Sequence, residues 1–406
     1  MQKEKQLIPQ LRFSEFEGVW EENKLGNIAS FFKGKGISKS DILEDGKNEC
    51  IRYGELYTTY NEVITSITSK TNISLDISIL SEENDVIIPS SGETQLDIAT
   101  ASCVLKSGVI LGGDLNIIKS QLNGVFLSYL LNNSKKKDIA KLAQGNSVVH
   151  LYNKQLGTLK INIPSLKEQQ KIANFLTSID NQIQALKKKK SLLEQYKKGI
   201  LQKIFKQELR FKDEDGNAFP EWKEKKLGDI LVEVNEKTTV SNQYTILSST
   251  AKGLFNQSDY FTRDIASKDN TGYKILRKEQ LVFSPQNLWL GNINVNCDFE
   301  VGIVSPSYKV FEFNVKLTSF NFCKYLLFTN RMFYEYAQAS EQGASVVRRN
   351  LDMSSFKAIP IKLPSIKEQS KIANFLSTID ENIELVNTKI EHTKAYKKGL
   401  LQQMFV

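Results

Sequence analysis

Basic residues stand beside aromatic and hydroxyl residues at several turn-rich points of this chain. Lysine and arginine can bind phosphate, while asparagine, arginine and serine can hydrogen-bond to base edges. In the first half this group comprises Lys33, Lys35, Lys39, Arg52, Tyr53, Tyr57, Ser90, Ser91 and Thr94. In the second half it comprises Arg263, Tyr273, Lys274, Asn287, Trp289, Asn292, Arg348 and Arg349. Taken as groups, these residues lead to the hypothesis that the chain contacts DNA. Each alone is more simply an exposed loop side chain, and Trp289 and Tyr273 are more simply core residues.

Catalytic motifs are missing from the sequence. The stretch GKGISKS at 34–40 does not have the spacing of a phosphate-binding loop, and no G-x-G-x-x-G follows a strand pattern. The N/D-P-P-Y/F motif of amino-methyltransferases is absent, and His150 and His392 are the only histidines. Glu221-Trp222-Lys223 is an isolated E-x-K, which arises readily by chance. We therefore expect no catalytic residue in this chain, and an enzyme of unfamiliar type is the weaker alternative.

Cysteine usage limits metal and redox chemistry. Cys50, Cys103, Cys297 and Cys323 are isolated from one another and form no C-x-x-C pair. This pattern predicts no metal site and no disulfide, and it fits a reducing cytoplasm. The N-terminal sequence lacks the apolar core of a signal peptide, and no apolar run approaches the roughly 20 residues of a membrane span. We expect a cytoplasmic protein.

The elements that must position the polar groups are organised around a duplicated segment. PSLKEQQKIANFLTSID at 164–180 returns as PSIKEQSKIANFLSTID at 364–380, and YKKGILQKIF at 196–205 returns as YKKGLLQQMF at 396–405. The offset is 200 residues throughout, which indicates a duplicated unit. Ser165 with Glu168, and Ser365 with Glu368, match the S-x-x-E capping box that begins a helix.

Apolar residues then recur every three and four positions, as in a coiled coil. The first copy places Ile172, Leu176, Ile179, Ile183, Leu186, Leu193, Ile200 and Ile204 on this seam, and the second places Ile372, Leu376, Ile379, Ile383, Val386, Ile390, Leu400 and Met404 there. Polar residues interrupt the seam at Lys190, Lys197, Thr393 and Lys397. Each helix would be about 60 Å long at 1.5 Å per residue and needs a partner. Antiparallel pairing of the two copies is favoured; parallel pairing and pairing between chains stay open.

The rest of the chain repeats its frame and varies its contents. LRF at 11–13 returns at 209–211, KLGNI at 24–28 returns as KLGDI at 226–230, and QGNSVV at 144–149 returns as QGASVV at 342–347. Between these markers we predict strands in 85–94, 96–105, 108–118, 280–296 and 301–313, and helices in 126–131, 136–143 and 321–340. The fold class is therefore α+β: two globular α/β domains separated by two long helices that form an antiparallel coiled coil. We expect domains at 1–163 and 208–363, and helices at 164–207 and 364–406.

The positive charge is concentrated on one predicted helix. The formal net charge is +8, and 164–205 carries nine lysines against three acidic residues. A basic balance favours nucleic acid as a partner. A solvated coiled-coil face explains the same lysines equally well.

The layout resembles the specificity subunit of type I restriction–modification systems. The resemblance rests on the duplicated P-S-x-K-E-Q-x-K-I-A…L-x-x-I-D helix, the opening segments 8–28 and 209–230, and GKGISKSDI at 34–42 with CIRYGELYT at 50–58. IIPSSGET, GGDLNII and GIVSPSYKVF look like strand motifs of that family's target recognition domains.

The resemblance implies a non-catalytic subunit whose two recognition domains each read one half of a split, non-palindromic DNA site. The long helices would set the spacer and dock two methyltransferase subunits, and the complex would recruit endonuclease/translocase subunits. S-adenosylmethionine, ATP and Mg would belong to those partners, and this chain would hold no cofactor. Two alternatives are a structural coiled-coil adaptor without DNA readout and a fused modification–restriction enzyme, which would need the missing motifs.

Overall fold

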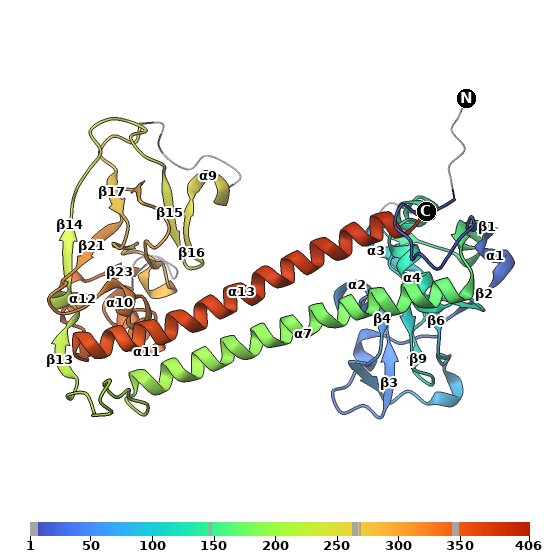
Figure 1. The fold of residues 1–406 in the computed structure, drawn as a ribbon, viewed down its shortest axis with the longest axis horizontal. Helices are drawn as coiled ribbons and strands as arrows, with labels where there is room; N and C mark the ends of the chain where they lie inside the picture. Colours follow the sequence, from blue (N-terminus) through green and yellow to red (C-terminus); the bar gives the residue numbers. More distant parts are fainter. Residues whose placement is uncertain (1–6, 146–147, 262–266, 268, 343–348) are drawn as a thin grey trace. The chain divides into compact units, whose positions relative to one another are not determined.

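The chain folds into two compact units whose boundaries lie within its two long helices. The computed structural model describes residues 7–145, 148–261, 267, 269–342 and 349–406. Unit 1 comprises Met1–Lys188 and Val386–Val406, and unit 2 comprises Lys189–Leu385. The long helices are α7 (Leu166–Phe205) and α13 (Ile366–Met404), drawn in green and red in Figure 1. Each unit therefore contains one part of both helices.

Unit 1 holds the first part of the chain up to the middle of α7. Its strands are β1 (Glu21–Lys24), β2 (Ala29–Lys33), β3 (Asn48–Ile51), β4 (Val63–Ile64), β5 (Ser69–Thr71), β6 (Asp85–Pro89), β7 (Ser91–Gly92), β8 (Ser102–Val104), β9 (Ile110–Leu111), β10 (Leu115–Ser120), β11 (Val149–His150) and β12 (Lys160–Ile163). Its shorter helices are α1 (Leu25–Ile28), η1 (Lys39–Asp41), α2 (Glu55–Thr58), η2 (Leu75–Ile77), α3 (Gln95–Ile98), α4 (Gly124–Asn132), α5 (Lys136–Leu142) and α6 (Asn153–Leu156).

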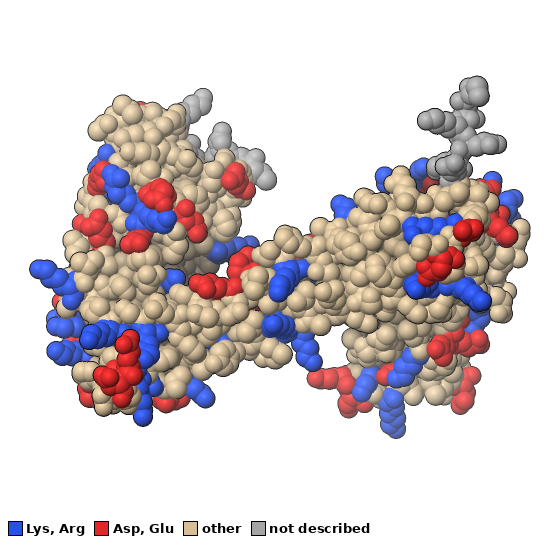
Figure 2. Space-filling view, in the orientation of Figure 1, with Lys and Arg blue, Asp and Glu red and all other residues tan. Residues whose placement is uncertain are grey.

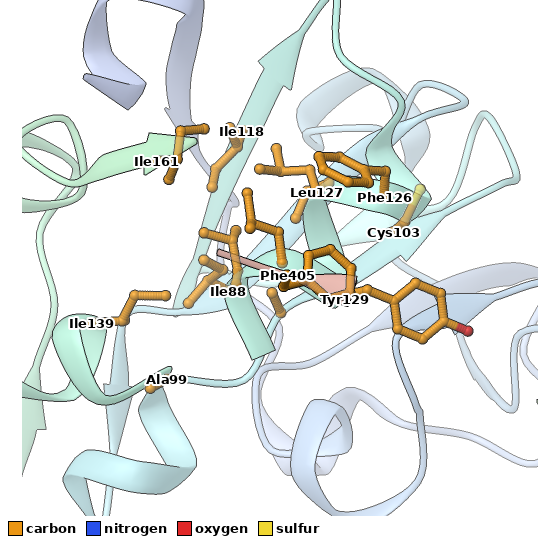
Figure 3. Packing of buried hydrophobic residues seen from close by; sticks show 14 of the residues in the cluster. Ile88, Ala99, Cys103, Ile118, Phe126, Leu127, Tyr129, Ile139, Ile161 and Phe405 are labelled. Atoms are coloured by element: carbon orange, nitrogen blue, oxygen red, sulfur yellow. The ribbon is translucent and has the colours of Figure 1, made fainter. Parts of the chain in front are cut away.

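A five-stranded sheet in the order β2-β10-β6-β8-β4 forms the centre of unit 1. Strand β6 is buried along its whole length, as expected of a central strand, and α4 packs against β6 and β8. The end of α13 completes this core: the ring of Phe405 lies 5.6 Å from that of Phe126 and 6.3 Å from that of Trp20. Figure 3 shows Phe405 among Ile88 and Tyr129. The first half of the chain thus needs the C-terminal helix to close its core.

Unit 2 follows the same plan with different strands. Its strands are β13 (Lys223–Lys226), β14 (Leu231–Val234), β15 (Leu247–Thr250), β16 (Gly253–Asn256), β17 (Lys274–Arg277), β18 (Leu281–Phe283), β19 (Ile293–Val295), β20 (Val301–Val304), β21 (Lys309–Phe313), β22 (Ser340–Gln342), β23 (Arg349–Leu351) and β24 (Pro360–Leu363). Its shorter helices are α8 (Leu227–Ile230), α9 (Gln257–Tyr260), η3 (Leu288–Leu290), α10 (Phe320–Leu326), α11 (Asn330–Gln338) and α12 (Met353–Ala358).

A four-stranded sheet in the order β14-β21-β18-β19 lies in unit 2 beside two-stranded pairs such as β15-β16 and β17-β20. Its core includes Phe283, Phe311 and Phe356. The rings of Phe283 and Phe311 are stacked, with their centres 5.5 Å apart. The ring centre of Phe205, at the end of α7, lies 6.3 Å from that of Trp222 and 5.8 Å from that of Phe322. Phe205 therefore occupies in unit 2 the place that Phe405 occupies in unit 1.

The two long helices run antiparallel within each unit, as the sequence predicts. In unit 1, Trp20 contacts both Glu168 near the start of α7 and Phe405 after the end of α13, while Asp180 further along α7 meets Lys397. The predicted pairing positions Ile172, Leu176, Ile179, Ile183, Ile372, Leu376, Ile379, Val386 and Ile390 are buried, and Leu186, Leu193 and Ile383 are half-buried. Several of them also face the sheet domains, so the seam serves two interfaces.

The capping-box prediction is only half correct. The hydroxyl of Ser165 accepts a 3.4 Å hydrogen bond from the Glu168 amide, and Ser365 accepts the equivalent bond at 3.3 Å. The Glu168 carboxylate, however, does not return to the helix end. It binds Arg12 and Trp20 instead, because those donors lie in the buried space that the carboxylate enters.

Two further predictions differ from the structure. The segment 96–105 is not one strand: Thr94 accepts from the Asp97 amide and begins α3, and only Ser102–Val104 is extended. The segment 321–340 is two helices, because Thr329 accepts from the Met332 amide and begins α11. In both places a side-chain cap starts a new element inside a continuous apolar pattern.

Candidate nucleic-acid interface

Two loops of unit 1 cross with only backbone between them. The loop after β2 contains Gly34 and Gly36, and the turn between β9 and β10 contains Gly112 and Gly113. A Cβ atom on Gly34 would stand 2.0 Å from the carbonyl oxygen of Gly112, and one on Gly113 would stand 3.2 Å from the amide nitrogen of Gly36. Gly34 is therefore required where the loops meet, and a side chain at Gly113 would fit only if the facing backbone moved. The crossing fixes the positions of the side chains beside it.

Predicted contact residues of unit 1 gather at this crossing. The Lys35 amide donates to the Leu111 carbonyl at 2.9 Å, and the Gly112 amide donates to the Ile51 carbonyl at 2.9 Å, so Lys35 and Arg52 flank the same glycine turn. Lys35 is exposed and Arg52 is half-buried. The guanidinium Nε of Arg52 is buried and has no hydrogen-bond partner among the described residues. The Nε atom is shielded from solvent and can donate to a ligand only after the side chain moves; the half-buried Arg52 guanidinium as a whole is a charged donor of the kind that binds phosphate or a base edge.

Tyrosines extend this face. The rings of Tyr53 and Tyr57 lie 6.5 Å apart, and Tyr57 is exposed. Burial of part of the ring raises the pKa of Tyr57, and the neighbouring Tyr53, Glu93 and Asp97 raise it further. Glu93 and Asp97, which flank Thr94, are thus near enough to Tyr57 to affect its ionisation. We define the unit 1 face as Lys33, Lys35, Arg52, Tyr53, Tyr57 and Thr94.

Among the remaining predicted residues of this half, Lys33 belongs to the unit 1 face, and Lys39, Ser90 and Ser91 do not. Lys33 is exposed, and its Nζ lies 5.9 Å from the centre of the Tyr152 ring. Tyr152 was not among the residues predicted from the sequence. Lys39 is exposed on η1. Ser90 and Ser91 are buried, and the Ser90 backbone bonds to Asp114 and Leu151. We leave the two serines out of the unit 1 face.

A second polar face in unit 2 is built around η3. The guanidinium carbon of Arg349 lies 4.4 Å from the centre of the Trp289 ring. The Ser249 hydroxyl donates to the Asn292 side chain at 2.8 Å, and Asn287 precedes the helix. The indole Nε1 of Trp289 and the Nε of Arg349 are buried without a hydrogen-bond partner among the described residues. We define the unit 2 face as Asn287, Trp289, Asn292 and Arg349.

A cavity of about 640 Å³ opens beside Trp289. Its walls include Lys252, Asn294, Phe328 and Phe333. The Asn294 amide donates to the Ser249 hydroxyl and to the Thr250 carbonyl, which ties this wall to the β15-β16 hairpin. Sequence reasoning missed Lys252 and Asn294. The T-A-K-G turn at 250–253 could have indicated Lys252, because a lysine at a hairpin tip is an exposed cation.

Lys274 does not reach the surface in the structure. It lies on β17 and is only 6% exposed. Burial lowers the pKa of Lys274, and the nearby Lys309 lowers it further. Tyr273 is half-buried and its hydroxyl accepts from the Ser267 amide at 3.2 Å. We leave both residues out of the unit 2 face. The predicted residues Arg263 and Arg348 lie outside the described residues.

Neither unit shows one large basic patch on the face that Figure 2 draws. Blue and red side chains are interspersed over both units. Mixed charge of this kind favours local contacts over a broad electrostatic attraction. No helix among the described residues is long and apolar enough to cross a membrane. No group of three or more His, Cys, Asp or Glu side chains in the described ranges could hold a metal ion.

Comparison with known proteins finds one family over most of the chain. The family model for the type I restriction modification DNA specificity domain matches twice, at residues 17–195 and 220–394. The two matches correspond to the two halves of the duplication.

Relatives and solved structures agree with this match. A type I restriction enzyme specificity subunit of Methanocaldococcus jannaschii, MjaVIII, is 23% identical over 98% of this chain and 95% of its own length. A second from the same organism, the putative MjaX subunit, is 26% identical over 70% of this chain and 67% of its own length. The crystal structure of a type I restriction–modification S subunit from M. genitalium has a TM-score of 0.61 at 16% identity, covering 98% of this chain and 99% of that one. The chain belongs to the family of type I restriction–modification DNA specificity proteins and carries two copies of its specificity domain.

Proposed function

We propose that this chain is the DNA sequence-specificity subunit of a type I restriction–modification complex. Each unit reads one half of a bipartite DNA site, and the subunit itself is non-catalytic. The observation that carries the proposal is a contrast: the two units share their structural elements but differ in their polar faces. Both units share the same helix pair, aromatic closure and opening segment, while the unit 1 face and the unit 2 face have different side chains on different loops. Two units with the same structural elements but different polar faces favour recognition of two different half-sites.

Direct readout is supported by the unpartnered donors on both faces. Arg52, Trp289 and Arg349 each hold a buried N–H without a partner in the described chain. Arginine donors suit guanine edges and phosphates, and each good bidentate contact contributes about 1–3 kcal/mol of discrimination. The helix pair would set the length of the unread spacer between the half-sites.

Two methyltransferase subunits are the proposed direct partners. Apolar side chains at equivalent places on both helices are exposed: Leu166 and Ile366 at the starts, and Tyr196 and Tyr396 further along. A surface that is present twice on one chain favours two copies of one partner. Endonuclease/translocase subunits would join through that complex. S-adenosylmethionine, ATP and Mg would be bound by the partner subunits, and this chain would hold no cofactor. The cytoplasm is the proposed location, because the DNA substrate is there.

The proposal is tested by DNA binding of the assembled complex with its cognate methyltransferase. We expect specific affinity that falls with salt and that loses roughly 1–3 kcal/mol for each mismatched base pair within a half-site. Changes in the spacer sequence at constant length should leave affinity unchanged. Equal affinity for the site and for scrambled DNA would overturn the proposal and favour a structural coiled-coil adaptor.

A further inference from the structure

Two lysines interrupt the apolar seam of the long helices, and each has an aspartate opposite it. Lys397 Nζ lies 2.7 Å from Oδ1 of Asp180 within unit 1. Lys197 forms the equivalent ion pair with Asp380 within unit 2. The aspartates end the duplicated L-x-x-I-D motif, and the lysines belong to the duplicated Y-K-K-G motif. Both motifs therefore meet in the structure as one charge pair in each unit.

Each pair is enclosed by a tyrosine from its own unit. The Tyr129 hydroxyl donates to Asp180, and the Tyr325 hydroxyl donates to Asp380 Oδ2 at 2.8 Å. Lys397 Nζ lies 5.1 Å from the centre of the Tyr129 ring, and Lys197 Nζ lies 5.4 Å from that of Tyr325. Burial raises the pKa of both tyrosines, so both remain hydrogen-bond donors at neutral pH. The side chains of Lys397 and Asp180 are 14% and 23% exposed.

The apolar seam alone does not define how far one helix is displaced along the other. Apolar residues repeat along both helices, so a slip by one heptad still brings many apolar side chains together. The same slip separates the charges. It places Lys397 opposite Ala173 or Lys187, and it places Asp180 opposite Ile390 or Met404. A largely buried charge without its partner is strongly unfavourable, and single polar residues in coiled coils specify register in this way.

We propose that the pairs Asp180–Lys397 and Asp380–Lys197 fix the register of the two long helices and are therefore positioning residues that determine which DNA spacer length the subunit accepts. The inference rests on the proposed function for its DNA consequence. The tyrosines link each charge pair to the helix beneath the sheet, α4 in unit 1 and α10 in unit 2. In unit 1, Lys397 also binds Glu62 at 3.2 Å, ahead of β4. The register is thus transmitted to the domain that carries the reading face.

The test compares charge reversal with charge exchange in the full complex with methyltransferase. The variants are Lys397→Asp, Asp180→Lys and the double variant Asp180→Lys/Lys397→Asp, all in a Glu62→Gln chain, because Glu62 contacts Lys397 and would repel a carboxylate at that position. The Glu62→Gln chain without further change is their reference. Lys398→Asp is the matched control, since Lys398 is the exposed neighbour on the same helix. Methylation is measured on DNA in which both half-sites are constant and the spacer changes one base pair at a time.

We expect wild type, the Glu62→Gln reference and Lys398→Asp to prefer one spacer length, and each single reversal at the pair to lose that preference while still requiring the same half-site bases. The double variant should regain the wild-type preference. If the single reversals keep the wild-type preference, or if the double variant fails to regain it, the proposal is overturned.

A second measurement follows the register without DNA. Spin labels at Ser178→Cys and Lys394→Cys, both exposed in unit 1, report the distance between the helices in a Cys297→Ser chain. We expect one narrow distance distribution for the wild-type pair, a broadened or shifted one for Lys397→Asp, and a narrow one again for the double variant. A narrow, unchanged distribution in Lys397→Asp would overturn the proposal. A wild-type complex without any spacer preference would instead count against the proposed function, and the spin-label result would still decide on the register.

Discussion

At the scale of single residues, Glu168 gathers three donors from the opening segment of unit 1. Arg12 binds both carboxylate oxygens, at 2.8 and 2.7 Å, and the Trp20 indole donates at 3.3 Å. Arg210 binds Glu368 in the same way in unit 2, at 3.2 and 3.0 Å. The S-x-x-E spacing identified both glutamates as important for the helix start, but their arginine partners are more than 150 residues away and could not be predicted from local sequence.

Removal of Arg12 should therefore destabilise unit 1. The Glu168 side chain is 1% exposed, so Arg12→Ala leaves a buried carboxylate with one indole donor. Loss of one partner from a buried ion pair costs about 3–5 kcal/mol. Urea unfolding followed by circular dichroism measures the effect. Lys160→Ala is the control because its ion pair with Glu22 is exposed on both sides, and it should show no measurable change. Equal midpoints for the two variants would contradict this role of Arg12.

The four cysteines are free in the structure and should differ in reactivity. Cys50, Cys103 and Cys323 are buried, and Cys297 is exposed. Burial raises the pKa of Cys50 to about 11 and that of Cys103 and Cys323 to about 12, so their thiols stay protonated at pH 7.5. Maleimide should modify the folded protein at Cys297 alone, even though burial also raises the pKa of that thiol. Mass spectrometry of the labelled peptides checks the site, and fast labelling of Cys103 would contradict the described core.

At the scale of elements, periodicity predicted the long helices well because they repeat one pattern for about ten turns. It performed less well where a cap begins a new element, as at Thr94 and Thr329, since a single hydroxyl decides there between strand and helix or between one helix and two. Most positions expected on the seam are buried, because burial follows the 3-4 repeat. The sequence did not predict that Lys274, Ser90 and Ser91 are buried, because whether a position in or next to a strand faces a core depends on pairing partners distant in sequence.

Truncation of a buried side chain on the helix seam should destabilise the protein, whereas truncation on the outer face of the same helix should not. Leu176 is completely buried, and Leu192 on the same helix is 55% exposed. Leu176→Ala should reduce the free energy of unfolding by about 2–5 kcal/mol, because it leaves a cavity between the helix and the sheet domain. Leu192→Ala should change it by less than about 0.5 kcal/mol. Thermal unfolding of both variants measures the difference, and a larger loss for Leu192→Ala would be inconsistent with this packing.

The unit 1 face gives a prediction about salt dependence. Lys35→Ala should remove one phosphate contact and lower the slope of log affinity against log salt by about 1. Arg52→Ala should instead relax the base preference at one position of one half-site, at a cost of about 1–3 kcal/mol. Lys160→Ala serves as the control of equal charge change and should leave both quantities unaltered. Anisotropy titrations of the methyltransferase complex at several salt concentrations provide the measurement. A Lys35→Ala complex with the wild-type slope would exclude Lys35 from the interface.

At the scale of the whole molecule, the duplication fixes a frame while the faces differ. The shared frame could be predicted from the sequence alone, because both copies of the repeat occur in one chain. The arrangement of the unit 1 face was only partly predictable: Lys35 and Arg52 come together through a glycine crossing that joins segments about 80 residues apart in the sequence. The same frame with different faces is what a subunit needs if it is to bind two like partners and read two unlike half-sites.

The most direct test of this reading is genome-wide methylation by single-molecule sequencing. A host expresses the cognate methyltransferase with or without this chain, and the methyltransferase is first shown to be active with another specificity subunit. We predict a new split, non-palindromic motif with one spacer length, methylated only when the chain is present. Absence of any new motif in the presence of the chain would contradict sequence specificity as its function.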